Sequence, residues 1–166
     1  MKPIWILFFF LTIGSSINAQ DKNDATTEIH LLLDAWHEAA AVADLETYFS
    51  KLADNAIFIG TDATENWTKK EFRAYATPFF EVGKAWIFKP LQRNIYFSPD
   101  GKTAWFDELL DTQMKICRGS GVLIHVNRQW KIAHYVLSMT VPNDKSSEVI
   151  NLKTTTDDSL MEQLRK

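Results

Sequence analysis

Three side chains in the second half of the chain are suited by type and position to move protons. His134 has an unperturbed pKa of about 6.5, close to working pH, so it is the best candidate for a general acid or base. Asp107 and Glu108 are consecutive in a strand-like run, so they point to opposite faces and one of them should face inward. A carboxylate enclosed by apolar side chains has a raised pKa, which suits proton transfer. We favour Asp107, because it shares a face with Trp105.

Each of these candidates also has a structural interpretation. The imidazole of His134 can equally be a core group that is hydrogen-bonded to a neighbour. The inward carboxylate can equally form a structural ion pair with Arg118. The residues therefore predict where a site would lie, and they leave open whether it catalyses a reaction.

A two-residue hairpin at Asn127-Arg128 decides which way His134 points. Asn tolerates a positive φ, so these residues suit such a turn. Counting outward from the turn pairs His134 with Gly121 and places Gly119 on the same face. Two glycines opposite the imidazole would leave space above it, which predicts a cavity there. A bulge between Gly119 and Gly121 would reverse the direction of Arg118.

The binding site that we expect is an aromatic cavity with few polar groups, the usual form of a small-molecule site. The expected ligand is a small, partly apolar molecule. The predicted lining consists of six aromatic and two polar residues: Trp36, Tyr48, Phe58, Trp67, Phe72, Trp105, Arg118 and Ser138. His37, next to Trp36, could lean toward the same interior. Asp62 and Glu65, in the loop of residues 61–67, lie either at the pocket mouth or in solvent.

Helices and strands of a mixed domain must position these groups. Apolar residues recur at helical spacing in three segments that begin near residues 28, 44 and 68. Asp44 is a suitable N-cap, and Thr68 with Glu71 forms a capping box. Strand-like runs follow the second and third helices, over residues 56–60, 86–97, 103–114, 119–126 and 130–141. Helices segregated beside an antiparallel sheet predict an α+β domain, a cone-shaped roll whose wide end is a pocket.

The first 19 residues have the three-part pattern of a secretory signal peptide. Lys2 precedes an apolar run over residues 4–13, and Ala19 offers a small residue before the cleavage point at Gln20. The run is shorter than the roughly 20 residues that cross a bilayer. We therefore expect a secreted or periplasmic protein. After the signal peptide we expect a flexible lead-in at 20–27, one domain at 28–142 and a polar tail at 143–166 with a helical turn near residues 148–152.

Charge and motifs exclude several functional classes. Removing Lys2 from the 18 basic residues leaves 17 against 21 acidic ones, so a nucleic-acid or anionic-membrane partner is not expected. The single Cys117 permits no intramolecular disulfide. His30, Asp34 and His37 have spacings at which a metal site can be imagined, but a solvated helix face with local charge pairs fits them better. We expect no metal and no cofactor, because phosphate-loop and nucleophile-elbow patterns are missing as well.

Several segments resemble the nuclear transport factor 2-like superfamily, especially its SnoaL-like branch. They are LLDAWHEAAAVADLETYFSKLADNAIFIGTDATENW, GKTAWFDELLD, and CRGSGVL followed by QWKIAHYVLSMTVPND. The likeness extends over about residues 26–142, and it implies three N-terminal helices packed on a curved, mainly antiparallel sheet.

The resemblance implies a fold more than a function. The superfamily includes isomerases, cyclases, dehydratases and hydrolases, as well as binding and dimerisation domains. No motif here matches the catalytic set of its ketosteroid isomerases residue by residue. Our leading hypothesis is a small-molecule binder. The alternatives are an acid–base enzyme that uses His134 with Asp107 or Glu108, and a homodimerisation module, because sheet-face dimers are frequent in the superfamily.

Overall fold

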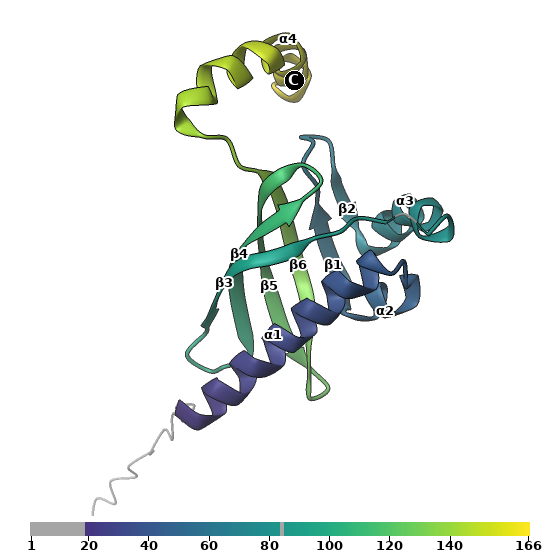
Figure 1. Ribbon diagram of the computed structural model, residues 1–166, viewed down its shortest axis with the longest axis vertical. Coiled ribbons are helices and arrows are strands. Elements are labelled where there is room, and N and C mark those ends of the chain that lie inside the picture. Colours follow the sequence, from purple (N-terminus) through teal and green to yellow (C-terminus); the bar gives the residue numbers. More distant parts are fainter. Residues whose placement is uncertain (1–18, 84) are drawn as a thin grey trace, which may run out of the picture.

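A computed structural model describes residues 19–83 and 85–166 (Figure 1). The predicted signal peptide lies outside these residues, apart from Ala19. The helices are α1 (Ala19–Ala41), α2 (Leu45–Ser50), α3 (Lys69–Glu81) and α4 (Ser146–Leu164), with a short 3-10 helix, η1 (Asn143–Lys145), before α4. None of the described helices is both long enough and apolar enough to cross a membrane.

Six strands form one sheet in the order β2-β1-β6-β5-β4-β3. They are β1 (Leu52–Ile59), β2 (Asn66–Thr68), β3 (Lys89–Phe97), β4 (Thr103–Thr112), β5 (Lys115–Val126) and β6 (Gln129–Met139). β1 runs parallel to β6, and every other pairing is antiparallel. The chain thus returns from the last hairpin to lay β6 beside its first strand.

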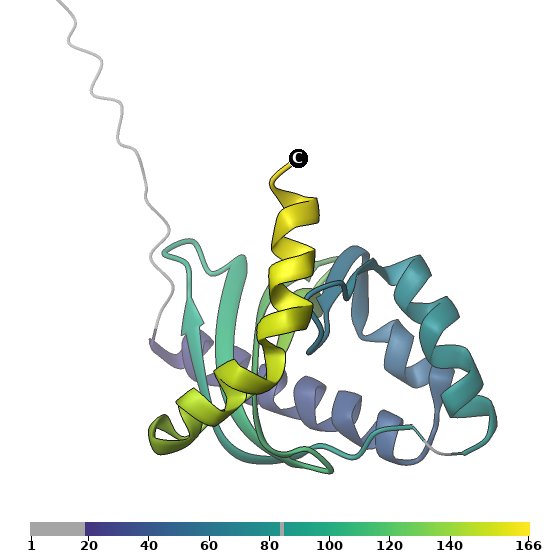
Figure 2. The same ribbon diagram turned by 90° about the horizontal axis from the view of Figure 1, so that it is seen from above.

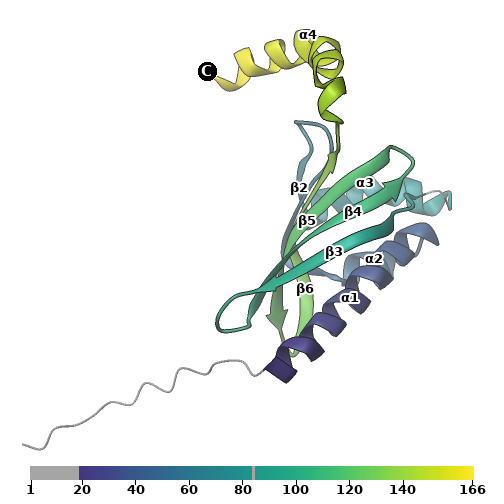
Figure 3. The same ribbon diagram turned by 60° about the vertical axis from the view of Figure 1, so that its left-hand side comes forward.

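Helices α1, α2 and α3 all lie on one side of the sheet (Figures 1 and 3). Seen from above, α1 and α3 border the domain on two sides and α2 lies between them (Figure 2). Ile29, Leu33 and Trp36 face inward from α1, where they meet buried side chains of the sheet. The expected α+β roll with a mainly antiparallel sheet is confirmed.

Local sequence signals account for the helix boundaries. The carboxylate of Asp44 accepts a hydrogen bond from the N–H of Thr47 at 3.0 Å, which caps α2. Thr68 and Glu71 form both bonds of a capping box at the start of α3. Gly83 follows that helix with a φ of +67°, a conformation that favours glycine. The cap at Asp44 and the capping box at Thr68 were both expected from the sequence.

A β-bulge in β6 overturns the predicted orientation of His134. The hairpin at Asn127-Arg128 is present, with φ values of 50° and 63°. Leu123 pairs with Ile132 as expected, but Val122 then pairs with His134, so Ala133 is an extra residue. A shift of one residue turns every following side chain to the other face. The pairing of Gly121 with His134 was therefore wrong.

Both ends of the described chain are helical where the sequence predicted less order. α1 begins at Ala19 and includes the polar residues 20–27, which were expected to be a flexible lead-in. α4 extends well beyond the short helical turn that was expected near residues 148–152. No side chain of α4 is buried, and the helix lies beyond one end of the sheet, away from α1 (Figures 1 and 3).

Candidate functional site

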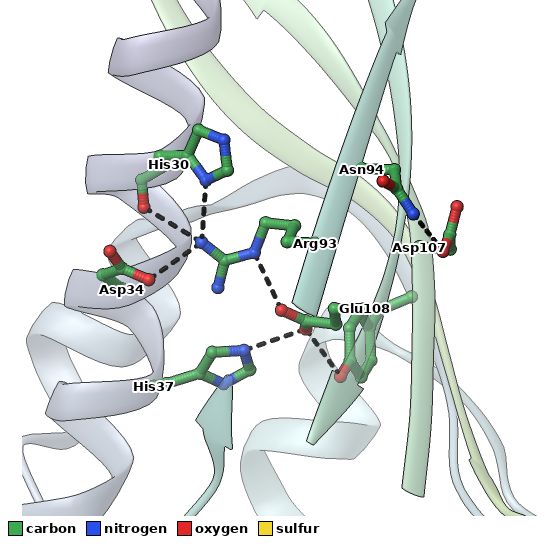
Figure 4. Close-up of polar contacts among 8 residues, drawn as sticks. His30, Asp34, His37, Arg93, Asn94, Asp107 and Glu108 are labelled. Atoms are coloured by element: carbon green, nitrogen blue, oxygen red, sulfur yellow. Dashed lines mark hydrogen bonds and ion pairs between the residues drawn. The ribbon is translucent and has the colours of Figure 1, made fainter. Parts of the chain in front are cut away.

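A buried carboxylate, Glu108, is the centre of a polar cluster inside the domain (Figure 4). Along β4 the side chains alternate, so Trp105 and Asp107 lie on the outer face while Phe106 and Glu108 face the helices. The Oε1 atom of Glu108 lies 2.9 Å from Nε2 of His37. The same oxygen accepts a hydrogen bond from the Tyr135 hydroxyl at 3.3 Å. Glu108 is only 1% exposed, so these contacts replace water.

Arg93 links this carboxylate to helix α1. It sits opposite Glu108 in the β3–β4 pairing, and its Nε donates to Glu108 Oε2 at 2.9 Å. Its Nη1 donates to Asp34 Oδ1 at 2.8 Å and lies 3.4 Å from His30 Nδ1. In Figure 4 the guanidinium lies between α1 and β4. His30 and Asp34, which were expected on a solvated face, therefore lie around an arginine.

The groups around Glu108 keep its carboxylate ionised. Burial would raise the pKa of Glu108, but the hydrogen bond from His37 and the interactions with His37 and Arg93 outweigh it and keep that pKa below its ordinary value. Burial, followed by the nearby charge of Glu108, raises the pKa of Tyr135. Glu108 is therefore an ionised acceptor and Tyr135 a protonated donor. This is the pattern of a structural ion-pair network rather than of a proton-transfer pair.

A separate pocket of about 170 Å³ lies between α3 and the sheet. Half of its lining is aromatic. The lining residues come from β1, the β1–β2 loop, β2, α3, the segment before β3, the β4–β5 turn and β6: Phe58, Gly60, Thr61, Glu65, Trp67, Phe72, Tyr75, Trp86, Phe88, Gln113, Met114 and Leu137. None of the described residues of the Glu108 cluster belongs to this lining. Phe88 lies between the two sites, with its ring centroid 6.0 Å from that of His37.

Stacked rings form much of the pocket wall. Trp67 stacks on Tyr75 with centroids 4.6 Å apart, and Phe72 stacks on Phe58 at 3.8 Å. Phe72 also stacks with Trp86 at 5.8 Å. Side chains that already pack on one another lose little conformational entropy when a ligand binds beside them. The wall is therefore preorganised for an apolar guest.

The structure divides the predicted pocket residues into three groups. Phe58, Trp67 and Phe72 line the pocket. Trp36 and Tyr48 stack in the closed core, with centroids 5.0 Å apart, and are not part of the lining. The remaining three, Trp105, Arg118 and Ser138, lie exposed on the outer face of the sheet.

The predicted catalytic residues do not converge. His134 is half-buried on the outer face, next to Val122. Asp107 lies on that face too, where it accepts a hydrogen bond from Asn94 at 3.1 Å. Glu108 alone faces the interior, so the preference for Asp107 as the inward carboxylate was wrong. Arg118 is exposed and is not the partner of the inward carboxylate, whose cation is Arg93.

Sequence reasoning missed Arg93 and Tyr135. A usable signal existed for Arg93, because counting outward from the Ser98–Gly101 turn pairs it with Glu108. The inward direction of Tyr135 depends on the bulge in β6, because the register counted from the turn places the residue after His134 on the outer face. No group of three or more His, Cys, Asp or Glu residues suited to a metal ion occurs in the described part of the chain.

Comparisons with known proteins agree with this architecture. The family model described as "SnoaL-like domain" matches residues 29–142. No curated protein matches the chain.

Solved structures share the fold at low sequence identity. An NTF2-like protein of unknown function from Pseudomonas putida KT2440 has a TM-score of 0.62 at 17% identity, covering 74% of this chain and 92% of that one. A candidate dehydratase of the NTF2-like family from Streptomyces avermitilis has a TM-score of 0.63 at 14% identity, covering 73% and 99%. A protein of unknown function with a cystatin-like fold from Nostoc punctiforme has a TM-score of 0.59 at 14% identity, covering 75% and 95%.

Proposed function

The chain belongs to the SnoaL-like domain family, and we propose that it binds a small, partly apolar molecule in the aromatic pocket. The observation that carries this proposal is the pocket itself, of about 170 Å³ and lined by Phe58, Trp67, Phe72, Trp86 and Phe88 among others. Buried apolar surface in such a site supplies the binding free energy, and the few polar groups orient the guest.

The volume limits the size of the guest. Pockets for drug-sized ligands usually measure about 300–1,000 Å³. An apolar cavity of about 150 Å³ accepts benzene. A pocket of about 170 Å³ therefore suits a molecule with one ring or a compact branched group.

Polar residues at the pocket give the guest a defined orientation. Thr61 and Gln113 are exposed and Glu65 is half-buried, whereas Phe72 and Leu137 are buried. The polar side chains thus lie toward solvent, and the deepest part of the lining is apolar. A guest with an apolar body and one polar end fits this gradient.

The Glu108 cluster supports a binding role over acid–base chemistry. Its carboxylate is engaged by His37, Arg93 and Tyr135. A general base must lie within hydrogen-bond reach of the proton that it removes. A molecule in the pocket meets Phe88 before it meets His37.

Calorimetric titration with phenol and benzyl alcohol tests the proposal. Met114, half-buried in the lining, is replaced by Trp to fill the pocket, and Leu137→Phe does the same from β6. Ile116→Trp, on β5 but outside the lining and 49% exposed, is the matched control. We expect millimolar or tighter binding to the wild type and to the control, and at least tenfold weaker binding to the two filled variants. Equal binding to all four proteins, or none to the wild type, would overturn the proposal.

A further inference from the structure

We infer that the pocket selects a cation: a small organic ammonium group on an apolar body. This inference rests on the proposed function and adds a charge to it. Among the described residues, the pocket lining contains one charged side chain, Glu65, and no Lys or Arg. A lone carboxylate in an otherwise uncharged lining complements a positive charge and repels a negative one.

The fold holds the Glu65 carboxylate in place. Its Oε2 atom accepts a hydrogen bond from the N–H of Asp62 at 3.1 Å. The backbone of Glu65 is bonded to the loop as well, since its carbonyl accepts from the N–H of Gly60 at 3.0 Å. Asp62 is outside the pocket lining, and its Oδ1 accepts from the N–H and the hydroxyl of Thr64 at 2.9 and 2.6 Å. The loop thus holds the Glu65 carboxylate through Oε2 and forms no hydrogen bond with Oε1.

Gly60 provides the space for that carboxylate. A Cβ atom built on Gly60 would collide with Oε2 of Glu65 and would lie 2.9 Å from its Cδ. The carboxylate therefore lies over the bare backbone at the end of β1. Gly60 and Glu65 both border the pocket, so the carboxylate that lies over Gly60 is at the pocket wall.

No described basic group neutralises this charge. Glu65 forms no ion pair with any described residue, and its Oε1 accepts no hydrogen bond from one. An ammonium ligand would supply the missing counter-charge and would donate to the free oxygen. Charge-assisted bonds of this kind are stronger than those between neutral groups.

The aromatic side chains of the lining strengthen the preference for a cationic guest over a neutral one. Charges attract more strongly where water is displaced by apolar side chains, because the local dielectric constant falls. Aromatic rings also attract cations, and tryptophan does so best. Trp67 and Trp86 both line the pocket. A neutral guest of the same shape would gain the apolar contacts alone.

A series of three ring compounds of similar size tests the charge directly: benzylammonium, benzyl alcohol and benzoate, titrated at pH 7. We expect benzylammonium to bind about three- to tenfold more tightly than benzyl alcohol, and benzoate to bind most weakly. Equal affinities for all three would refute the charge preference while leaving the proposed binding function intact. No binding by any of the three would refute both.

Two variants locate the preference. Glu65→Gln removes the charge but keeps an oxygen that can accept from Asp62, and Gly60→Ala keeps the charge but displaces the carboxylate. In both variants the ratio of the two affinities is the readout, and benzylammonium and benzyl alcohol should bind with nearly equal affinity. Glu38→Gln is the matched control, because it removes one negative charge from an exposed residue outside the lining. This variant should keep the full preference for benzylammonium over benzyl alcohol. An undiminished preference in both pocket variants would overturn the assignment to Glu65.

Discussion

Gly119 lies directly opposite Glu108 in the pairing of β4 with β5, and its missing side chain makes the buried cluster possible. A Cβ atom on Gly119 would collide with the Tyr135 hydroxyl and would lie 2.9 Å from Glu108 Oε1. Gly119 does face the interior, but the cavity predicted above the glycines of this strand is absent because side chains fill it. A tyrosine from β6 occupies it, and not His134.

Replacing Gly119 by Ala should destabilise the fold by about 1–3 kcal/mol, because overpacking a filled interior forces its neighbours to shift. Urea unfolding of purified variants measures the loss. In a Tyr135→Phe background the added methyl group no longer meets a hydroxyl, so the same change should cost less. Ser120→Ala, the next residue on the outer face, should change the free energy of unfolding by no more than about 0.5 kcal/mol. Equal losses from Gly119→Ala in both backgrounds would contradict the proposed contact.

Glu108→Gln should be among the most damaging single changes in the chain. It removes the buried one of the two carboxylates that Arg93 contacts and leaves only that of Asp34, whose side chain is 55% exposed. Breaking a buried ion pair on one side costs about 3–5 kcal/mol. Asp107→Asn is the natural comparison, because Asp107 is half-buried on the outer face and bonds to Asn94. Its cost should stay near 1 kcal/mol or below. Chemical unfolding measures the free energy of unfolding of both variants. Similar losses for Glu108→Gln and Asp107→Asn would contradict a structural role for Glu108.

The lowered pKa of Glu108 predicts a specific pH dependence. The unfolded chain binds a proton at this group near the ordinary value of 4.5, whereas the folded protein binds it only at lower pH. The unfolded state thus carries more protons in this window, so the stabilisation is complete above about pH 4.5 and is lost as the pH falls through the folded pKa. Carbon-13 titration of the side-chain carboxyl of Glu108 measures this directly. A midpoint above 4.5 would show that burial outweighs His37 and Arg93.

Local signals were sufficient for most of the fold. The cap at Asp44, the capping box at Thr68 and the hairpin at Asn127-Arg128 each depend on residues within a few positions, and each was predicted. The bulge at Ala133 was not, because it depends on two partner strands at once: β6 pairs with β5 on one side and with β1 on the other. One extra residue then moved His134 outward and Tyr135 inward.

The candidate site could be predicted only where hairpin geometry constrained it. Arg93 pairs with Glu108 across a turn that the sequence indicates, so counting residues outward from that turn could have predicted the pair. His37 lies 71 positions from Glu108, and only the packing of α1 against the sheet brings them together. Phe58, Trp67 and Phe72 were selected for their aromatic character, which marks both core and pocket. For that reason the same criterion also selected Trp36, which is closed in the core.

Export remains a prediction, and mass spectrometry tests it. We propose that residues 1–19 are removed during secretion, as the pattern around Lys2 and Ala19 indicates. The intact mass of protein recovered from the periplasm or medium of a bacterial host should correspond to a chain that begins at Gln20. A product of full-chain mass, retained inside the cell, would contradict this.

The most direct test of ligand binding follows the indole N–H signals in a nitrogen-15 correlation spectrum during titration with benzylammonium. Trp67 and Trp86 line the pocket, whereas Trp105 lies 45% exposed on the outer face of the sheet. The signals are assigned by single Trp→Phe replacements. The proposed function predicts saturable shifts for Trp67 and Trp86, with Trp105 unmoved. Shifts confined to Trp105, or no saturable shift at all, would contradict it.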